Sequence, residues 1–262
     1  MSDVPPLERL GNSRFPRSAN YDFTWLTQEP CGANPLWLTE WLCEDLKLKP
    51  GMRVLDLGCG RAKSSLFLAK EFDVEVFAVD LWFPPEENEQ RVADFGLSDH
   101  VTCLRGEARD LPFDFEFFDA IVAIDSIQYY GTDALWLPYV IQLLKPRGLL
   151  GFASAGVVNE MFHPVPDHLQ RFWVTDAWCL RTAAWWREHW ERTGLVDVLI
   201  SDVLTDGWKY WLDWAEACGF SEWYLETLRY DAGENLCYNR AIAKRADDSP
   251  NLTFNLQTGK QQ

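Results

Sequence analysis

Two apolar runs that each end in an acid constrain this fold most. Residues 54–60 read Val-Leu-Asp-Leu-Gly-Cys-Gly, and residues 76–79 read Val-Phe-Ala-Val and are followed by Asp80. Glycines after a buried strand let the backbone pass close to a ligand, because no Cβ blocks the approach and positive φ is accessible. An acid about 20 residues beyond such a loop accepts ribose hydroxyls in dinucleotide folds. The pattern predicts a nucleoside-binding crevice in which Asp80 holds a ribose.

Two details favour a sulfonium cofactor over a nicotinamide dinucleotide. A dinucleotide loop reads G-x-G-x-x-G, which would require glycine where this chain has Lys63. Asp56 lies at the strand end just before the glycines, where it would repel a pyrophosphate but attract a cationic sulfonium and its amino group. We therefore expect S-adenosyl-L-methionine as cofactor, with S-adenosyl-L-homocysteine as its product.

The middle of the chain alternates short apolar strands with helices. Helices are predicted over 35–46, 64–71, 85–95, 183–192 and 207–217. Strands are predicted over 54–57, 74–79, 101–104, 118–124, 149–153, 196–200 and 237–243. This rhythm predicts an α/β fold: a Rossmann-like, doubly wound, mostly parallel seven-stranded sheet with helices on both faces. Ligands bind such sheets outside the carboxyl ends of the strands, where four acids fall: Asp56, Asp80, Glu107 and Asp125.

The chain divides into three predicted parts. Residues 1–34 are polar and contain proline, which predicts an N-terminal arm or lid. Residues 35–246 form the α/β domain, with a substrate-covering insertion at about 156–182 that is rich in Pro, His and aromatic residues. Residues 247–262 are polar, and we expect a disordered tail.

Composition excludes several classes of partner. The net charge of -16 argues against binding nucleic acid or an anionic membrane, both of which attract basic surfaces. The seven cysteines lack paired short spacings, so we expect reduced thiols with no disulfide framework and no metal site. The first residues carry no export signal, and no apolar run reaches about 18 residues. These features predict a soluble, cytoplasmic protein.

Taken in order, the motifs resemble those of class I S-adenosylmethionine-dependent methyltransferases. The resemblance covers roughly residues 35–155 and rests on these segments: 54–60, Asp80, 106–108, 118–125 and 143–148. Three further segments resemble bacterial small-molecule methyltransferases near the cyclopropane-fatty-acid-synthase-like group: 127–131, 185–190 and 206–208.

The resemblance implies a role for each cofactor-site residue. Asp56, Gly58 and Gly60 would frame the methionine end of the cofactor. Asp80, followed by Leu81, would take the ribose. Glu107 and Ala108 would meet the adenine edge, and Asp125 would close the pocket near the sulfonium. The chain departs from the family where the third loop glycine is replaced near Arg61-Ala62, and where Pro-Gly-Gly reads Pro146-Arg147-Gly148.

Candidates for a catalytic role, in contacting the acceptor or taking its proton, are Asp125, Tyr129, His163 and His189. Histidine has a pKa near neutrality, which suits a general base. Each candidate has a structural alternative: Asp125 as a helix N-cap, and the aromatic and imidazole rings as packing. Of the 14 tryptophans, six at helical spacings are most simply core residues, and a minority would form an aromatic wall for a cation: Trp185, Trp186, Trp190, Trp208, Trp211 and Trp214.

The predicted function is methyl transfer to a small-molecule acceptor, at nitrogen or oxygen rather than carbon or sulfur, by in-line displacement. The acceptor is expected to be cationic or aromatic, a dedicated base is optional, and exposed aromatic residues would suit a homodimer. Two alternatives stay open: a cyclopropane-synthase-like enzyme acting on lipid, and a non-catalytic adenosylmethionine-binding module.

Overall fold

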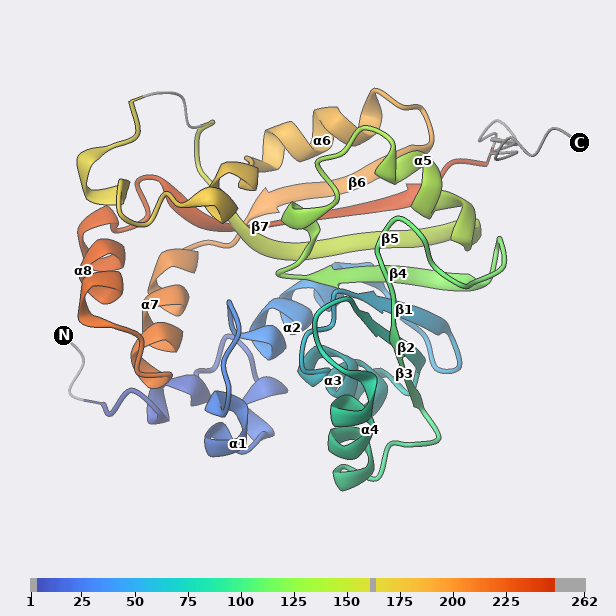
Figure 1. Cartoon of the computed structure of the whole chain (residues 1–262), viewed down its shortest axis with the longest axis horizontal. Coiled ribbons are helices and arrows are strands. Elements are labelled where there is room, and N and C mark those ends of the chain that lie inside the picture. Colours follow the sequence, from blue (N-terminus) through green and yellow to red (C-terminus); the bar gives the residue numbers. More distant parts are fainter. Residues whose placement is uncertain (1–3, 161–163, 248–262) are drawn as a thin grey trace, which may run out of the picture.

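A seven-stranded sheet in the order β3-β2-β1-β4-β5-β7-β6 forms the centre of the computed structural model, which describes residues 4–160 and 164–247 (Figure 1). The strands are β1 (Arg53–Leu57), β2 (Glu75–Asp80), β3 (Val101–Arg105), β4 (Phe118–Ile124), β5 (Leu144–Val157), β6 (Val196–Val203) and β7 (Leu236–Arg245). β7 runs antiparallel to β5 and β6, and the other pairs are parallel. The predicted Rossmann-like α/β fold is confirmed.

Helices cover both faces of the sheet. They are α1 (Phe23–Thr27), α2 (Pro35–Leu46), α3 (Lys63–Phe72), α4 (Pro85–Asp94), α5 (Trp136–Val140), α6 (Ala183–Glu191), α7 (Gly207–Ala217) and α8 (Glu222–Asp231). Side chains alternate along a strand. Val54 of β1 therefore packs in a core with residues of α2, α3 and α7, whereas Leu55 packs in a second core with α5 and α6.

The crevice opens between β1 and β4, where the chain connections leave the sheet in opposite directions. Two hydroxyl groups that follow β4 donate hydrogen bonds to the carbonyl at the end of β1. Ser126 Oγ lies 2.7 Å from the oxygen of Leu57, and the Tyr130 hydroxyl lies 2.9 Å from it. These bonds hold the two strand ends together at the point where doubly wound sheets bind ligands.

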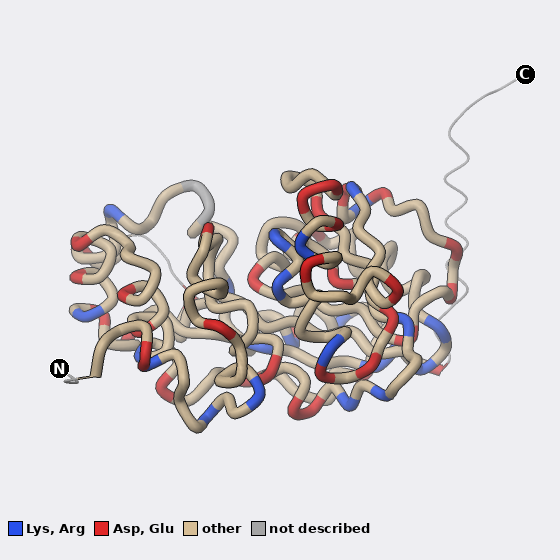
Figure 2. Tube along the Cα trace, turned by 90° about the horizontal axis from the view of Figure 1, so that it is seen from below, with Lys and Arg blue, Asp and Glu red and all other residues tan. Residues whose placement is uncertain are grey.

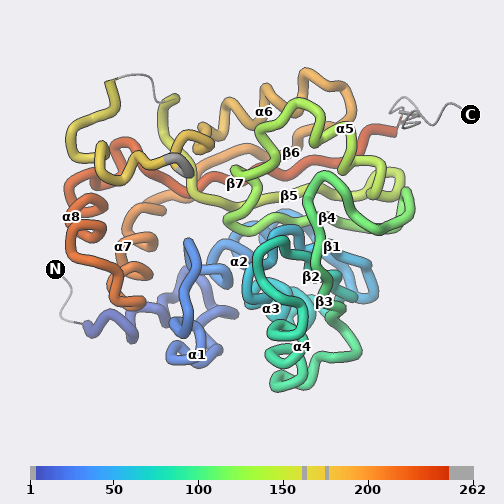
Figure 3. The backbone as a smooth tube through the Cα atoms, viewed as in Figure 1, coloured from blue at the N-terminus to red at the C-terminus, as the bar shows by residue number. Residues whose placement is uncertain are grey.

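Much of the predicted N-terminal arm packs into the domain. Phe15 is fully buried, with its ring centroid 5.3 Å from Trp37 of α2 and 5.2 Å from Tyr210 of α7. Arg9 forms ion pairs with Asp213 and Glu216 on α7. Figure 3 shows this N-terminal segment passing beside α7 and α2. The last part of the predicted arm, residues 28–34, continues to the crevice.

The predicted insertion and tail are described only in part. Leu169 and Leu180 of the insertion are buried in the core beside α7, whereas His163 lies outside the described residues. The predicted tail is outside the described part from residue 248 onward. The segment with Pro146-Arg147-Gly148 is an irregularity within β5, where Arg147 has φ +63°.

The prediction that most tryptophans pack in the core is confirmed. Trp186 and Trp190 of α6 are buried against Phe152, and Trp211 and Trp214 of α7 are buried on the opposite face of the sheet. No described helix has the length and apolar character needed to cross a membrane. Figure 2 shows acidic positions along the whole trace, interspersed with Lys and Arg.

Candidate functional site

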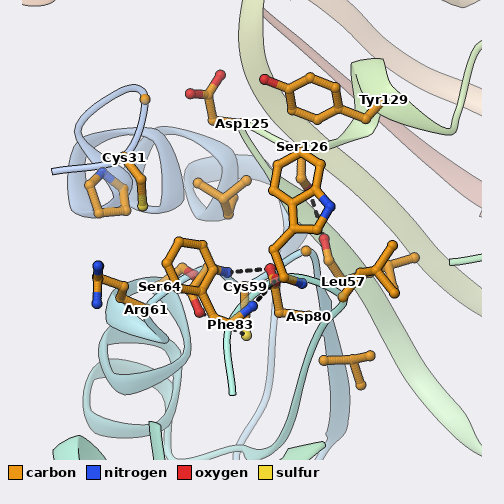
Figure 4. A pocket seen from close by; sticks show the side chains of 18 of the residues that line it. Cys31, Leu57, Cys59, Arg61, Ser64, Asp80, Phe83, Asp125, Ser126 and Tyr129 are labelled. Atoms are coloured by element: carbon orange, nitrogen blue, oxygen red, sulfur yellow. Dashed lines mark hydrogen bonds between the residues drawn. The ribbon is translucent and has the colours of Figure 1, made fainter. Parts of the chain in front are cut away.

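A cavity of about 290 Å³ lies at the carboxyl ends of β1, β2 and β4 (Figure 4). Its lining comes from the strand ends, from the segment before α2 and from α7. The lining residues fall within 29–35, 57–64, 79–83, 106–109 and 124–130, together with Trp214. The structure therefore brings together most of the residues predicted from the strand-end motifs.

The turn after β1 requires its glycines. Gly58 has φ +74° and Gly60 has φ +55°. A Cβ added at Gly58 would lie 2.5 Å from Cβ of Ser126, which no side chain can accommodate without displacing the neighbouring loop. Where the family has a third glycine, Ala62 also adopts the left-handed conformation, with φ +56°. The departure at Ala62 therefore preserves the backbone path of the turn.

Asp80 organises the loops on both sides of the cavity. Its Oδ2 accepts a hydrogen bond from the amide of Gly60 at 2.8 Å, and its Oδ1 accepts from the amides of Trp82 at 2.7 Å and Phe83 at 3.1 Å. A carboxylate offers about four lone-pair sites. Oδ2 thus retains capacity for one more donor, such as a ribose hydroxyl.

Asp56 lies below the turn and is not among the residues that line the cavity. The side chain is fully buried, and its Oδ2 accepts hydrogen bonds from the hydroxyls of Ser64 and Ser65, both at 2.6 Å. Oδ1 has no partner among the described residues. Burial raises the pKa of Asp56 to about 6. The predicted direct contact of Asp56 with a sulfonium is therefore not supported by its position.

Residues 29–33 form one wall of the cavity. Lys63, the first residue of α3, holds the segment just before this wall. Its buried ammonium group donates to the carbonyl oxygens of Leu26 at 2.9 Å and Gln28 at 2.5 Å. It also lies 5.6 Å from the ring centroid of Trp25. Burial lowers the pKa of Lys63. Sequence reasoning used Lys63 only to exclude a dinucleotide and missed this contact.

Asp125 fixes the next part of that wall. Its Oδ2 accepts from the amide of Ala33 at 2.8 Å, and its Oδ1 accepts from the amide of Ala155 at 3.0 Å. A Cβ at Gly32, which has φ +75°, would lie 2.2 Å from Oδ2. Burial raises the pKa of Asp125, while these amides lower it. The carboxylate caps no helix, so the N-cap interpretation is wrong.

Trp214 completes the wall from a distant part of the chain. Its indole Nε1 donates to the carbonyl of Gly32 at 2.9 Å, and its ring lines the cavity. No local sequence pattern distinguishes Trp214 from the neighbouring core tryptophans of α7. Its place in the site follows only from tertiary packing.

The other predicted cofactor-site residues lie in the cavity lining: Leu81, Glu107 and Ala108. Tyr129 also lines the cavity, and its ring contacts Trp82 edge-on at 5.5 Å between centroids. Figure 4 shows the Tyr129 side chain on the same side of the cavity as Asp125. This side of the cavity therefore combines the carboxylate of Asp125 with the exposed rings of Tyr129 and Trp82.

The structure does not bring His189 to the cavity. His189 lies on α6, where it is buried and stacks on Trp185 with 4.4 Å between ring centroids. Its Nδ1 contacts a guanidinium nitrogen of Arg192 at 3.1 Å, and burial lowers its pKa. These contacts fit the alternative of a packed core histidine. No group of residues suited to hold a metal ion occurs in the part of the chain that the structure describes.

We expect the substitution Lys63→Met to loosen the wall, because two buried carbonyls lose their donor. An unsatisfied buried group costs about 1–3 kcal/mol, so chymotrypsin should cleave within residues 23–34 on the order of tenfold faster than in the unmodified protein. Mass spectrometry of the fragments measures this rate. Lys209→Met, at an exposed position on α7, is the control. Equal cleavage of both variants would contradict the assigned role of Lys63.

We expect Asp56→Asn to remove a pH dependence of stability. The pKa of Asp56 is raised from 3.8 to about 6, so the folded state binds this proton more tightly than the unfolded chain. Its contribution to stability therefore falls as pH rises from about 4 to about 6, by about 3 kcal/mol at about 1.4 kcal/mol per pH unit. Urea unfolding of the protein, of Asp56→Asn and of the exposed-site control Asp99→Asn tests this. Parallel stability curves for the protein and Asp56→Asn would refute it.

Comparisons with known proteins place the central part of the chain in a family. Residues 54–148 match the family model described as a methyltransferase domain. Cyclopropane-fatty-acyl-phospholipid synthase of Escherichia coli (strain K12) is 36% identical over 117 residues, which are 44% of this chain and 29% of that protein. Sarcosine/dimethylglycine N-methyltransferase of Aphanothece halophytica is 32% identical over 110 residues, 41% of this chain and 39% of that protein. The chain thus matches well under half the length of these relatives.

Solved structures show the same fold. Phosphoethanolamine N-methyltransferase 2 of Haemonchus contortus, in complex with S-adenosyl-L-methionine, has a TM-score of 0.67 and 20% identity, covering 93% of this chain and 60% of that one. The glycine turn, Asp80 and the matched domain agree with the resemblance seen in the sequence. Residues 54–148 therefore match a methyltransferase domain, and the chain has the fold of solved methyltransferases.

Proposed function

We propose that this chain transfers a methyl group from S-adenosyl-L-methionine to nitrogen or oxygen of a small-molecule acceptor by in-line displacement. The observation that carries the proposal is the cavity itself. Its lining combines the glycine turn and Asp80 with the wall at 29–33, which is held by Lys63, Asp125 and Trp214. A nucleoside and a second, small reactant would meet in this cavity.

The residues present fit the cofactor. Asp80 Oδ2 would accept a ribose hydroxyl, Glu107 and Ala108 would flank the adenine, and the turn at Gly58–Gly60 admits a close backbone approach. The buried Nε of Arg61 has no hydrogen-bond partner among the described residues, and we assign it to the cofactor's carboxylate. The bound cofactor supplies a methyl group on an already activated sulfonium.

The protein's own contribution is alignment and exclusion of water. Holding two reactants in the correct orientation can accelerate their reaction as much as an effective concentration of about 10⁵ to 10⁸ M would. A closed wall also keeps water from the site. A protonated acceptor must also lose a proton. Asp125 and Tyr129 line the cavity and are our candidates to receive or relay it, with Asp125 already holding two amide donors. His189 does not line the cavity, so it is not a candidate.

The size of the cavity favours a small acceptor over a lipid. Its volume of about 290 Å³ is near the lower end of ligand-sized pockets, which span roughly 300–1,000 Å³. The net charge of -16 also disfavours an anionic membrane surface. The name of the Escherichia coli relative favours the competing function, cyclopropane formation on phospholipid chains. We further propose a cytoplasmic location, which suits the free thiols of the buried Cys43, Cys59 and Cys237.

We expect Asp80→Asn to weaken binding of S-adenosyl-L-homocysteine at least tenfold. The substitution removes the charge that accepts the ribose hydroxyl and places an amide N–H against existing donors. A hydrogen bond to a charged group contributes about 1.5–3 kcal/mol. Isothermal titration calorimetry measures the affinity, with Asp99→Asn as control and with thermal unfolding of each free protein to verify folding. An unchanged affinity in folded Asp80→Asn would contradict the assignment.

Methyl transfer itself is tested with labelled S-adenosyl-L-methionine and separate panels of amines, phenols, carboxylates and phospholipid vesicles. We expect label on a small amine or hydroxyl compound. Label on vesicle lipid would support the cyclopropane-synthase-like alternative. Cofactor binding without transfer to any panel would support the non-catalytic binding module, and absence of cofactor binding would refute the proposal.

A further inference from the structure

We infer that the acceptor carries no net negative charge: it is a neutral or cationic molecule, and phosphorylated or other net anionic compounds are excluded. This inference rests on the proposed function, since it concerns the second reactant in the same cavity. It follows from how the charged side chains that line the cavity are already paired.

Lys63 offers no charge to an acceptor. It is one of the cationic side chains in the lining, with Arg61 and Arg109. Its ammonium group is buried and donates to the carbonyls of Leu26 and Gln28. A ligand anion would have to displace these carbonyls and open the wall.

The two arginines are also committed. Arg61 Nη1 pairs with Glu29 at 2.9 Å, and its remaining Nε is the donor assigned above to the cofactor. Arg109 pairs with Glu107 at 3.0 Å and with Asp133 at 3.4 Å. Within residues 4–160 and 164–247, every cationic side chain of the cavity lining therefore already has a protein partner with which an acidic acceptor would compete.

The acidic side chains of the cavity lining also disfavour an anionic acceptor. Glu29, Asp80, Glu107 and Asp125 all line the cavity. Asp80 is assigned to the ribose, which leaves Asp125 as the carboxylate beside the wall at Gly32 and Ala33. Placing another anion there would require removing it from water beside a like charge and without a partner, which is costly.

The remaining surface suits a neutral or cationic group. The indole N–H of Trp214 is bonded to the carbonyl of Gly32 and Trp214 is almost fully buried, so this residue offers a ligand no charge and no donor. The exposed rings of Trp82 and Tyr129 adjoin each other at the same cavity, and Figure 4 shows Tyr129 toward Asp125. Aromatic faces attract cations, and a nearby carboxylate strengthens that preference.

The inference is tested by sorting reaction products by charge. The protein is incubated with labelled S-adenosyl-L-methionine and a deproteinised small-molecule extract, the unreacted cofactor is separated by chromatography, and the remaining labelled products are passed over an anion exchanger at neutral pH. We expect the enzyme-dependent label in the unretained fraction. Label mainly in the anion-retained fraction would overturn the inference while supporting methyl transfer. Absence of enzyme-dependent label, in contrast, would count against the proposed function.

A binding series tests the same point without turnover. The protein saturated with S-adenosyl-L-homocysteine is titrated with phenethylamine, phenethyl alcohol and phenylacetate, which share a similar aromatic body and differ in charge. We expect phenylacetate to bind at least tenfold more weakly than phenethylamine. Cys31→Lys adds a cation to the wall and should improve phenylacetate binding at least tenfold relative to the neutral control Cys31→Gln. Phenylacetate binding equal to or tighter than phenethylamine binding in the unmodified protein would overturn the inference.

Discussion

The carboxylate of Asp80 joins the two loops on which the site is built. By accepting the amide of Gly60 with one oxygen and those of Trp82 and Phe83 with the other, it sets the turn after β1 against the loop after β2. Charge-assisted bonds of this kind are short and strong. The same residue is thus organised before any ligand arrives, and Oδ2 has one acceptor position to offer. Preorganisation of this kind lowers the cost of binding a nucleoside there.

The wall at 29–35 is organised by three residues to which sequence reasoning had given other roles: exclusion of a dinucleotide for Lys63, contact with the sulfonium or acceptor for Asp125, and core packing for Trp214. Lys63 and Asp125 each hold backbone groups of the segment before α2, and Trp214 holds the carbonyl between them. Because these charges are used by the backbone, they are not free to recognise a charged acceptor. The groups that remain available in the cavity are the aromatic rings of Trp82 and Tyr129 and the carboxylate of Asp125. The acceptor preference that we infer therefore follows from the way these residues hold the backbone.

The fold and the cofactor side were predictable from sequence because both depend on local patterns. Parallel strands end at one edge of a sheet, so acids that terminate apolar runs, such as Asp80, Glu107 and Asp125, gather there. Strand alternation places Asp56 on the α3 face, which the motif alone did not indicate. The short helices α1 and α5 carry too few residues for a periodic signal. The burial of His189 and the position of Trp214 depend on tertiary packing, which spacing along the chain does not encode.

The matched methyltransferase domain provides only part of the cavity lining, which explains why the match does not identify the methyl acceptor. The matched domain spans residues 54–148 and contains the turn, Asp80 and Glu107, all on the cofactor side. The wall at 29–35 and Trp214 lie outside that match, whereas Asp125 and Tyr129, which we propose to face the acceptor, lie inside it. Relatives that share only the matched domain can therefore share a cofactor and differ in acceptor, because a different segment would line the acceptor side of their cavity. Specificity in this chain should accordingly change with substitutions at Cys31 or Trp214 more than with substitutions inside the shared turn.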